Sequence, residues 1–190
     1  IAMELAYAHN RGYDDEIIAA AVGDSRDGDG GTVAYDAGQS VGDGTTNITI
    51  DLITEVSEKF MDNDIDPGVQ KVWAVSPAQV RQMLQLAEIN SFDYNTVKPL
   101  ASGQVVDFMG FSFLPSTRLL DGSLGAGTSY NFAMTADALG LQVNQSMLAK
   151  VSEDPSISYA WRVYCEATYG AIRVEDEKVV RIDVTDTVTP

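Results

Sequence analysis

A stretch of small, turn-forming residues between Asp24 and Thr46 constrains the fold of this chain more than any other feature. It consists largely of glycine, aspartate, serine and threonine around one apolar patch, Val33 to Tyr35. These residue types favour turns and local side-chain hydrogen bonds over helices and strands. We therefore predict a long exposed loop that is functional or mobile, or that becomes ordered only against a neighbouring molecule. The packed elements must then lie on either side of it.

Before this loop, residues 1–22 repeat apolar side chains at helical spacing and end at Gly23, where a helix stop belongs. We predict one long helix. Gly12 lies in its middle and Asp14 is suited to cap a second helix, so the sequence leaves open whether the helix is continuous or is kinked or broken there.

Three elements with local signals follow the loop. Residues 47–61 return to helical spacing, and a Pro-Gly turn separates them from an apolar run, Lys71–Val75, that we predict as a strand. Ser76 and Pro77 then supply a helix N-cap and a first-turn proline. The helix that they open is predicted to pack through one face, made of Val80, Met83, Leu84 and Ala87.

The second half of the chain predicts mainly strands. Residues 91–100 are polar and extended, and residues 104–114 predict a strand with a bulge or bend at Gly110, ended by Pro115. A glycine-rich loop follows at residues 118–129.

The remaining residues complete the predicted secondary structure. Residues 130–143 fit a strand followed by a short helix, and residues 158–169 alternate like a strand. Residues 175–178 predict a turn between strands at 171–174 and 179–184, and so a terminal hairpin. Together these elements predict the α+β fold class.

The acidity of the chain limits its partners. Its 28 Asp and Glu against 12 Lys and Arg give a formal charge of -16, and no basic cluster interrupts them. Such a surface repels phosphate backbones and anionic lipid, so we predict no specific nucleic-acid binding. It suits a container lining that must not stick to packaged DNA, and equally an acidic enzyme or a halophilic protein. No apolar run is long enough to cross a membrane, and the first residues lack a signal peptide's basic start.

Two loop motifs resemble catalytic or metal sites. Residues 38–42, GQSVG, match the G-x-S-x-G pattern, which places a nucleophilic serine, here Ser40, on a strand-to-helix turn. No strong strand precedes it and the single histidine, His9, comes before the serine, so this signal is weak. The carboxylates of Asp24, Asp27 and Asp29 suggest a calcium loop, but their spacing does not match an EF-hand, and a solvated turn is favoured.

The other chemistry-bearing residues favour structural roles. His9 and one cysteine do not complete a tetrahedral zinc site, and we predict His9 on a helix surface. Cys165 lies in an apolar run, which predicts a buried small side chain. Most aromatic residues are predicted in the core, whereas Phe92 and Tyr94 pack either locally or against a neighbouring subunit. We therefore predict no catalytic, cofactor-binding or metal-binding residues and no cofactor.

Three segments resemble the major capsid protein family of tailed bacteriophages, which has the Hong Kong 97 fold. Residues 72–84, VWAVSPAQVRQML, resemble the family's strand, Ser-Pro turn and helix. Residues 102–116, SGQVVDFMGFSFLPS, resemble its segment of a glycine, a strand, Gly-Phe and a second strand. Residues 169–184 resemble its closing strands. The order and spacing of the segments carry the resemblance over nearly the whole chain.

The resemblance implies a Hong Kong 97-like fold with peripheral and axial domains and mixed or antiparallel sheets. Residues 1–50 would be the spine helix and following loop of the peripheral domain. Residues 51–159 would be mainly axial domain, and residues 160–190 strands that join the two. The family's N-terminal arm and extended E-loop, which usually bind neighbouring subunits, do not precede Ile1, so the chain is expected to be a fragment.

By the same resemblance the expected function is structural. Copies would assemble into pentamers and hexamers and then an icosahedral shell around DNA, in the virion, after synthesis in the host bacterial cytoplasm. The expected partner is the same chain, with scaffolding, portal and decoration proteins as further candidates, and with neither specific nucleic acid nor membrane. An encapsulin-like compartment shell is the main alternative, and a serine hydrolase using Ser40 the weaker one.

Overall fold

A six-stranded sheet and a separate two-stranded hairpin carry the fold in the residues that the computed structural model describes, 2–86, 107–119 and 128–186. The strands of the sheet are β3 (Ser40–Val41), β4 (Lys71–Val75), β5 (Asp107–Phe108), β6 (Phe111–Pro115), β7 (Thr128–Thr135) and β10 (Val179–Thr185). Their order is β3-β10-β7-β4-β6-β5; β3–β10 and β4–β6 are parallel pairs, and the others are antiparallel.

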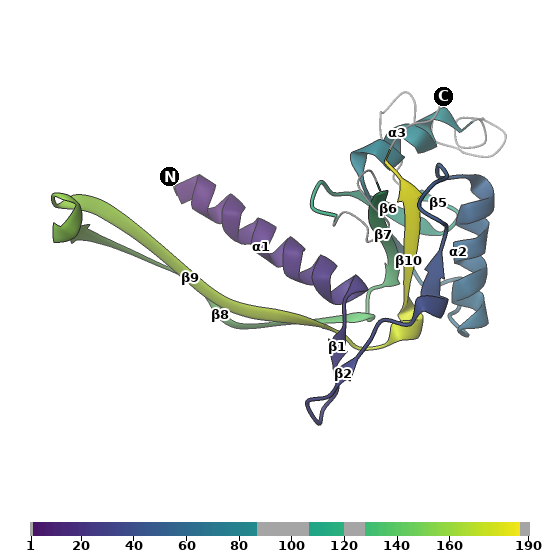
Figure 1. Ribbon diagram of the computed structural model, residues 1–190, viewed down its shortest axis with the longest axis horizontal. Coiled ribbons are helices and arrows are strands. Elements are labelled where there is room, and N and C mark those ends of the chain that lie inside the picture. Colours follow the sequence, from purple (N-terminus) through teal and green to yellow (C-terminus); the bar gives the residue numbers. More distant parts are fainter. Residues whose placement is uncertain (1, 87–106, 120–127, 187–190) are drawn as a thin grey trace.

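The hairpin consists of β8 (Leu139–Asp154) and β9 (Ala160–Arg173). It runs away from the sheet as a long arm, with helix α1 (Ala2–Val22) beside it (Figure 1). The arm and the sheet therefore form two distinct regions, joined where α1, β8 and β9 reach the sheet.

Helices α2 (Ile50–Asp62) and α3 (Pro77–Gln85) lie where the sequence predicted helices, and the N-cap predicted at Ser76 is confirmed. The Thr49 side chain accepts a hydrogen bond from the Leu52 N–H at the start of α2. At the start of α3, Ser76 and Gln79 form a reciprocal capping box. Both helices begin where side-chain acceptors satisfy the free N–H groups of the first turn.

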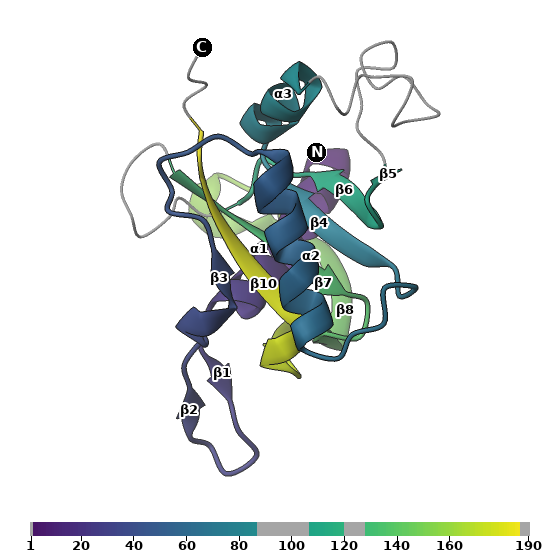
Figure 2. The ribbon, with the colours of Figure 1, turned by 90° about the vertical axis from the view of Figure 1, so that its right-hand side faces the viewer.

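The main core lies between these helices and one face of the sheet (Figure 2). Trp73 of β4 is fully buried there, with its ring centroid 5.3 Å from that of Phe111 and 5.4 Å from that of Phe113. The apolar side of α2 covers them through Ile53, Val56 and Phe60. The strand predicted at Lys71–Val75 is confirmed with these bounds.

A second, smaller core lies on the opposite face of the sheet. There Ile18 and Ala21, from the end of α1, pack against Ala74, Phe132 and Val179. Because successive side chains of a strand point to opposite faces, β4 supplies Trp73 to one core and Ala74 to the other.

Helix α1 is continuous through Gly12, which settles the alternative of a kink or break. The glycine has a packing reason. A Cβ atom at this position would lie 2.1 Å from the Tyr169 hydroxyl of β9. Gly12 therefore lets the hairpin approach the helix closely.

The prediction of one long loop at residues 24–46 is wrong in part. Strands β1 (Ser25–Arg26) and β2 (Thr32–Val33) form a short hairpin, a 3-10 helix spans Ala37–Gln39, and β3 joins the edge of the sheet. Gly42 has φ +90°, and a Cβ there would lie 2.3 Å from the Asp183 carbonyl oxygen. In this segment, glycine allows a close turn between short regular elements.

Two predictions in the second half need correction. The strand expected at residues 104–114 is a hairpin, β5–β6, whose two-residue turn holds Met109 and Gly110 at positive φ. The short helix expected within residues 130–143 is replaced by a turn and the start of β8. Leu139, Leu141 and Val143 alternate at the strand period, and they belong to β8.

The predicted terminal hairpin is also wrong. Strand β9 pairs with β8 in the arm, whereas β10 pairs with β7 and β3 in the sheet. Residues 174–178 thus carry the chain from one sheet to another. The polar stretch at 91–100, with Phe92 and Tyr94, lies outside the described residues.

Candidate functional site

Most residues of the hairpin arm are exposed to solvent. Strands β8 and β9 are paired from Leu139 opposite Arg173 out to Asp154 opposite Ala160, with two register shifts between Val143 and Leu148. Helix α1 lies along the half nearest the sheet, and the tip continues beyond the N-terminal end of the helix (Figure 1). The outer half of the arm therefore has no helix beside it.

An aromatic cluster attaches α1 to the inner half of the arm. The ring centroid of Tyr169 lies 4.3 Å from that of Tyr13 and 5.7 Å from that of His9, and the His9 and Tyr13 rings are 4.5 Å apart. The tilted and edge-on arrangements are those that aromatic pairs prefer. This cluster fixes the helix against β9 and leaves β8 less covered.

Apolar side chains along the arm are open to solvent. Trp161 is 69% exposed, and Val151, which lies directly opposite Val163, is 61% exposed. The larger exposed apolar residues of the two strands are Leu141, Val143, Met147, Leu148, Val151, Trp161, Val163, Tyr164 and Ile172. A series of this length on one element marks an interaction surface more often than chance exposure.

The backbone of the arm is open as well. Within the described residues, β8 and β9 pair only with each other, so neither outer edge is paired with another strand. An isolated two-stranded hairpin is at best marginally stable in water, and open edges invite pairing with other chains. The arm has the features of an element that another surface covers.

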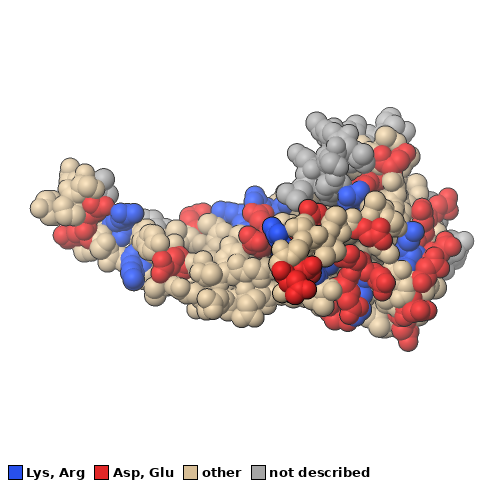
Figure 3. Space-filling model, turned by 60° about the horizontal axis from the view of Figure 1, so that its bottom comes forward, with Lys and Arg blue, Asp and Glu red and all other residues tan. Residues whose placement is uncertain are grey.

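Charge distinguishes the arm from the rest of the chain. Residues 139–173 contain three basic and three acidic residues and so carry no formal net charge, which leaves the whole charge of -16 on the other residues. Figure 3 shows a broad uncharged area in the middle of one face, with acidic residues gathered at the opposite end from the arm's tip. The basic residues of this range are Lys150, Arg162 and Arg173, and the acidic ones are Glu153, Asp154 and Glu166.

The acidic groups of the arm are engaged locally. Glu166 accepts hydrogen bonds from the Tyr164 hydroxyl and the Gln145 amide, which hold the pKa of its carboxyl below the usual value. Asp154 accepts from Ser156, and Arg162 lies 3.3 Å away; these contacts, led by the Ser156 hydroxyl, likewise lower the pKa of Asp154. An approaching surface therefore meets few unpaired carboxylates on the arm.

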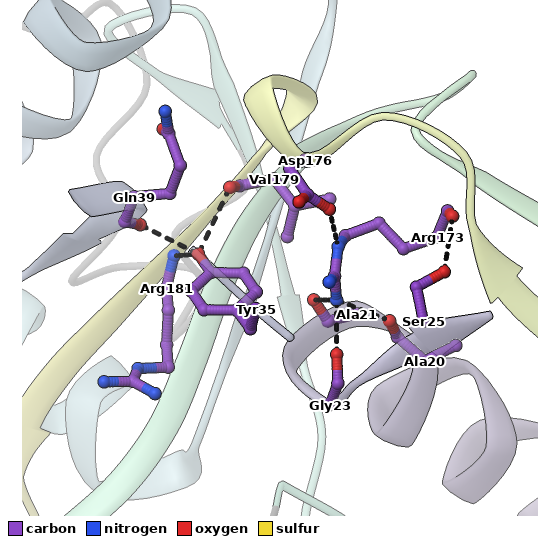
Figure 4. Close-up of polar contacts among 10 residues, drawn as sticks. All are labelled: Ala20, Ala21, Gly23, Ser25, Tyr35, Gln39, Arg173, Asp176, Val179 and Arg181. Atoms are coloured by element: carbon purple, nitrogen blue, oxygen red, sulfur yellow. Dashed lines mark hydrogen bonds and ion pairs between the residues drawn. The ribbon is translucent and has the colours of Figure 1, made fainter. Parts of the chain in front are cut away.

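A buried arginine fixes the arm to the sheet region (Figure 4). The guanidinium of Arg173, fully buried, forms an ion pair with Asp176 and donates hydrogen bonds to the carbonyl oxygens of Ala20, Ala21 and Gly23. These are free carbonyls at the end of α1, where the helix dipole also favours a cation. Arg173 thus joins the ends of α1 and β9.

Tyr35 continues this junction toward β10. Its ring lies under the Arg173 guanidinium at 4.9 Å, and its hydroxyl donates to the Gln39 carbonyl oxygen at 2.8 Å and accepts from the Arg181 N–H at 2.9 Å (Figure 4). Burial raises the pKa of the Tyr35 hydroxyl to about 12. The apolar patch within the predicted loop therefore contributes a half-buried anchor.

The structure separates the residues of the hydrolase alternative. Ser40 opens β3, paired with Arg181, and a 3-10 helix precedes it, so the order of elements is the reverse of a strand-to-helix turn. His9 packs against Tyr13 and Tyr169 on the arm side. The G-x-S-x-G match does not have the context that gives a serine its reactivity.

The acidic loop carries turn contacts. Asp27 accepts hydrogen bonds from the N–H groups of Asp29 and Gly31, which close the β1–β2 turn. Among the described residues, no group of three or more His, Cys, Asp or Glu side chains is placed to hold a metal ion. In the same part of the chain, no helix is long and apolar enough to span a membrane.

The sequence reasoning missed the exposure of the arm. Cys165 was predicted to be buried, but it is half-buried in β9 next to the exposed Tyr164. A signal was present: Met147-Leu148 and Val163-Tyr164 place apolar residues at consecutive positions, which gives a strand two apolar faces. Such a strand is covered on both faces either within its own fold or by a partner, and only the structure distinguishes these.

Known proteins resemble this chain in sequence and in fold. The sequence matches the profile of a family described as phage capsid protein over residues 1–186. No curated protein sequence matches the chain. The solved structure of Mycobacterium phage Che8 matches with a TM-score of 0.65 at 14% identity, over 99% of this chain and 61% of that one. The capsid of cyanophage P-SCSP1u gives 0.69 at 14% identity, over 98% and 65%.

A compartment shell is also similar. The holo-SrpI encapsulin complex from Synechococcus elongatus matches with a TM-score of 0.55 at 12% identity, over 99% of this chain and 66% of that one. At these identities the likeness concerns the fold, which is the Hong Kong 97-like fold that the resemblance implied. The chain spans roughly three fifths to two thirds of the length of these solved chains.

Proposed function

The chain belongs to the phage capsid protein family, and on this premise we propose that it works by self-association as the shell-forming part of a major capsid protein. The observation that supports this most is the uncovered arm. A neutral, apolar, two-stranded hairpin with open edges has little reason to persist alone, and a contact with neighbouring copies would cover it.

The charge distribution favours assembly through this arm. Copies that each carry -16 repel one another, and the repulsion is least where the arm, with no formal net charge, forms the contact. In a shell, the acidic residues outside the arm would also repel packaged DNA. We propose pentamers and hexamers as the capsomers, the virion as the location and the host bacterial cytoplasm as the site of synthesis, with scaffolding, portal or decoration proteins as further partners.

The function is proposed to be non-enzymatic. Family membership supports it, and so does the position of Ser40 at the start of a sheet strand with the only histidine on the arm side. Esterase and phosphatase substrates should not be turned over. Reproducible turnover that disappears in Ser40→Ala would contradict this.

A salt series tests the assembly proposal. The screening length is about 30 Å at 0.01 M salt and about 3 Å at 1 M, so repulsion between acidic copies should fade as salt rises while apolar contacts remain. Light scattering should show monomers or small oligomers at low salt and growing assemblies at high salt, and negative-stain images should show rings or shells. A chain that stays monomeric at high concentration throughout the series would refute the proposal.

The division into domains remains a prediction. The proposed peripheral part, residues 1–50, contains α1, and the proposed axial part, residues 51–159, contains α2 except for its first residue, together with α3 and most of the sheet. The boundary between 159 and 160 falls at the tip of the β8–β9 hairpin. Limited proteolysis that releases fragments at these boundaries would support the division.

A second candidate function is an encapsulin-like compartment shell, which the match to the Synechococcus elongatus complex favours. Such a shell would recruit a cargo peptide. Co-purification of one cargo protein with assembled particles, released by deletion of a short terminal peptide of that cargo, would support it over the phage capsid.

A further inference from the structure

The tip of the arm displays two aromatic side chains on an ordered turn. Tyr159 is 68% exposed and Trp161 is 69% exposed. Ser158 and Tyr159 both have positive φ, near +58° and +59°, a conformation that residues with side chains rarely adopt. The turn is held by Asp154, whose carboxylate accepts from Ser156 and whose carbonyl oxygen accepts from the Tyr159 N–H. The turn thus presents Tyr159 in a conformation that costs energy, and Trp161 follows it as the second residue of β9.

The base of the same arm contains a groove. It has a volume of about 560 Å³ and is lined by residues of both strands around Gly140 and Gly170. A Cβ at Gly170 would meet nothing within 4 Å, so the space above this residue is open. A Cβ at Gly140 would lie 3.6 Å from methyl groups of Ile172 and Val174, and Ile172 is one of the residues that line the groove. Glycines inside strands often mark places where another group approaches the backbone closely.

The tip and the groove are complementary in chemistry. Tyrosine and tryptophan are the residues most enriched among binding hot spots, and they act by filling desolvated pockets. The groove is within the range of about 300–1,000 Å³ found for pockets that enclose drug-sized molecules. Both surfaces lie on the segment with no formal net charge, so a second copy can bring its tip to this groove while its acidic residues stay apart.

We propose that Tyr159 and Trp161 at the arm tip of one copy dock into the groove around Gly140 and Gly170 of a second copy. This rests on the proposed function, because it names the contact through which copies associate. The two surfaces differ and lie at opposite ends of one hairpin, so the contact is head-to-tail: each copy offers one tip and one groove. Contacts of this kind build rings when the rotation closes, whereas a self-complementary contact stops at a pair.

Two variants separate the two halves of the contact. Trp161→Ala removes an aromatic ring from the tip and leaves the groove unchanged. Gly170→Val fills the groove and leaves the tip unchanged. Both positions are open in the single chain, so the variants should fold, which circular dichroism checks. Matched controls are Met3→Ala, at a side chain of α1 that is also 69% exposed, and Gly28→Val, at a glycine whose Cβ also meets nothing within 4 Å.

The measurement is sedimentation velocity of the 190-residue chain in 1 M salt with reductant. Each of Trp161→Ala and Gly170→Val should weaken association at least tenfold, as loss of a hot spot does, and the controls should behave as the original chain. An equal mixture of the two variants should form one-to-one pairs, because the tip of Gly170→Val fits the groove of Trp161→Ala. The pairs should not grow further.

The outcomes distinguish this contact from the general function. If both variants associate like the original chain, the tip-to-groove contact is wrong and assembly through other surfaces stands. If each variant is weakened but the mixture does not pair, the contact is not head-to-tail and the proposal is overturned. If the original chain does not associate at any salt or concentration, the proposed function and this contact fall together.

Discussion

The six-stranded sheet and the β8–β9 arm are built from similar residues, yet the sheet is covered on both faces and the outer half of the arm is not covered. In the sheet, Trp73 is fully buried between α2 and its neighbouring strands, whereas Trp161 of the arm is 69% exposed. The rest of the chain also carries a net negative charge, whereas the arm has no formal net charge. In the sheet region, apolar residues stabilise one chain. On the arm, the same residue types contribute little to the single chain and are available to a partner.

The contrast between the two tryptophans gives the largest expected effect. Trp73→Ala should lower the free energy of unfolding by about 3–5 kcal/mol, because it leaves a cavity in the main core. Trp161→Ala should change it by less than about 0.5 kcal/mol, as exposed substitutions do. Urea unfolding of both variants at low salt, where copies stay apart, measures this. Similar losses in the two variants would show that the arm is packed within its own chain.

The two arginines sharpen the comparison at the junction. Arg173→Lys should cost about 2–4 kcal/mol, because lysine cannot reach Asp176 and the carbonyl oxygens at the end of α1 together. Arg162→Lys, at an exposed ion pair near the tip, should cost about 0–1 kcal/mol. Thermal unfolding of the two variants compares them directly. A larger loss from Arg162→Lys would contradict the role given to Arg173.

The contact between helix and hairpin is tested at Gly12. Alanine normally favours a helix over glycine by about 1 kcal/mol, but here its Cβ would meet the Tyr169 hydroxyl. Gly12→Ala should therefore destabilise the chain by roughly 1–3 kcal/mol through overpacking. In a Tyr169→Phe background, which removes the hydroxyl, the same substitution should become neutral or stabilising. Identical effects in both backgrounds would exclude the close contact.

The smallest expected effect is on the pH dependence of stability, at the turn between β7 of the sheet and β8 of the arm. Asp137 is bound by Lys178 and Thr135, and these hydrogen bonds, chiefly from Lys178, lower the pKa of its carboxyl from 3.8 to about 2. A carboxyl whose pKa is lower in the folded chain than in the unfolded chain stabilises the fold when the pH is above its pKa in the unfolded chain. This contribution to stability is lost as pH falls from about 4 to about 2. Asp137→Asn should flatten that part of the curve of unfolding free energy against pH. An unchanged curve would argue against the Lys178 contact.

Local signals in the sequence identified several elements correctly. Ser76-Pro77 located the start of α3, the run Lys71–Val75 located β4, and the spacing of apolar residues located α2. These depend on caps and periodicity within a few residues, which act before any long-range contact forms. The α+β class followed from the same signals, and the family resemblance from their order.

Strand partners and exposure could not be predicted in this way. Residues 171–174 and 179–184 look like a hairpin in sequence, but β9 and β10 enter different sheets, because β8 is already paired along the whole of β9. Alternation shows that a strand has two different faces, and it does not show which strand lies beside it. The strand β3 within residues 24–46 could not be predicted for the same reason, since it is defined by pairing with β10, far along the chain.

The sequence by itself determined the cap at Ser76, the positions of α2 and α3, the acidity of the chain and the neutrality of residues 139–173, because each of these is a property of neighbouring residues or of a sum over them. Only the tertiary structure decided that Trp73 is buried and Trp161 exposed, that Gly12 receives Tyr169, and that Arg173 joins α1 to β9. The physical reason is that burial and pairing depend on segments far apart in the chain. In this protein those segments cover the sheet on both faces and leave the outer arm uncovered.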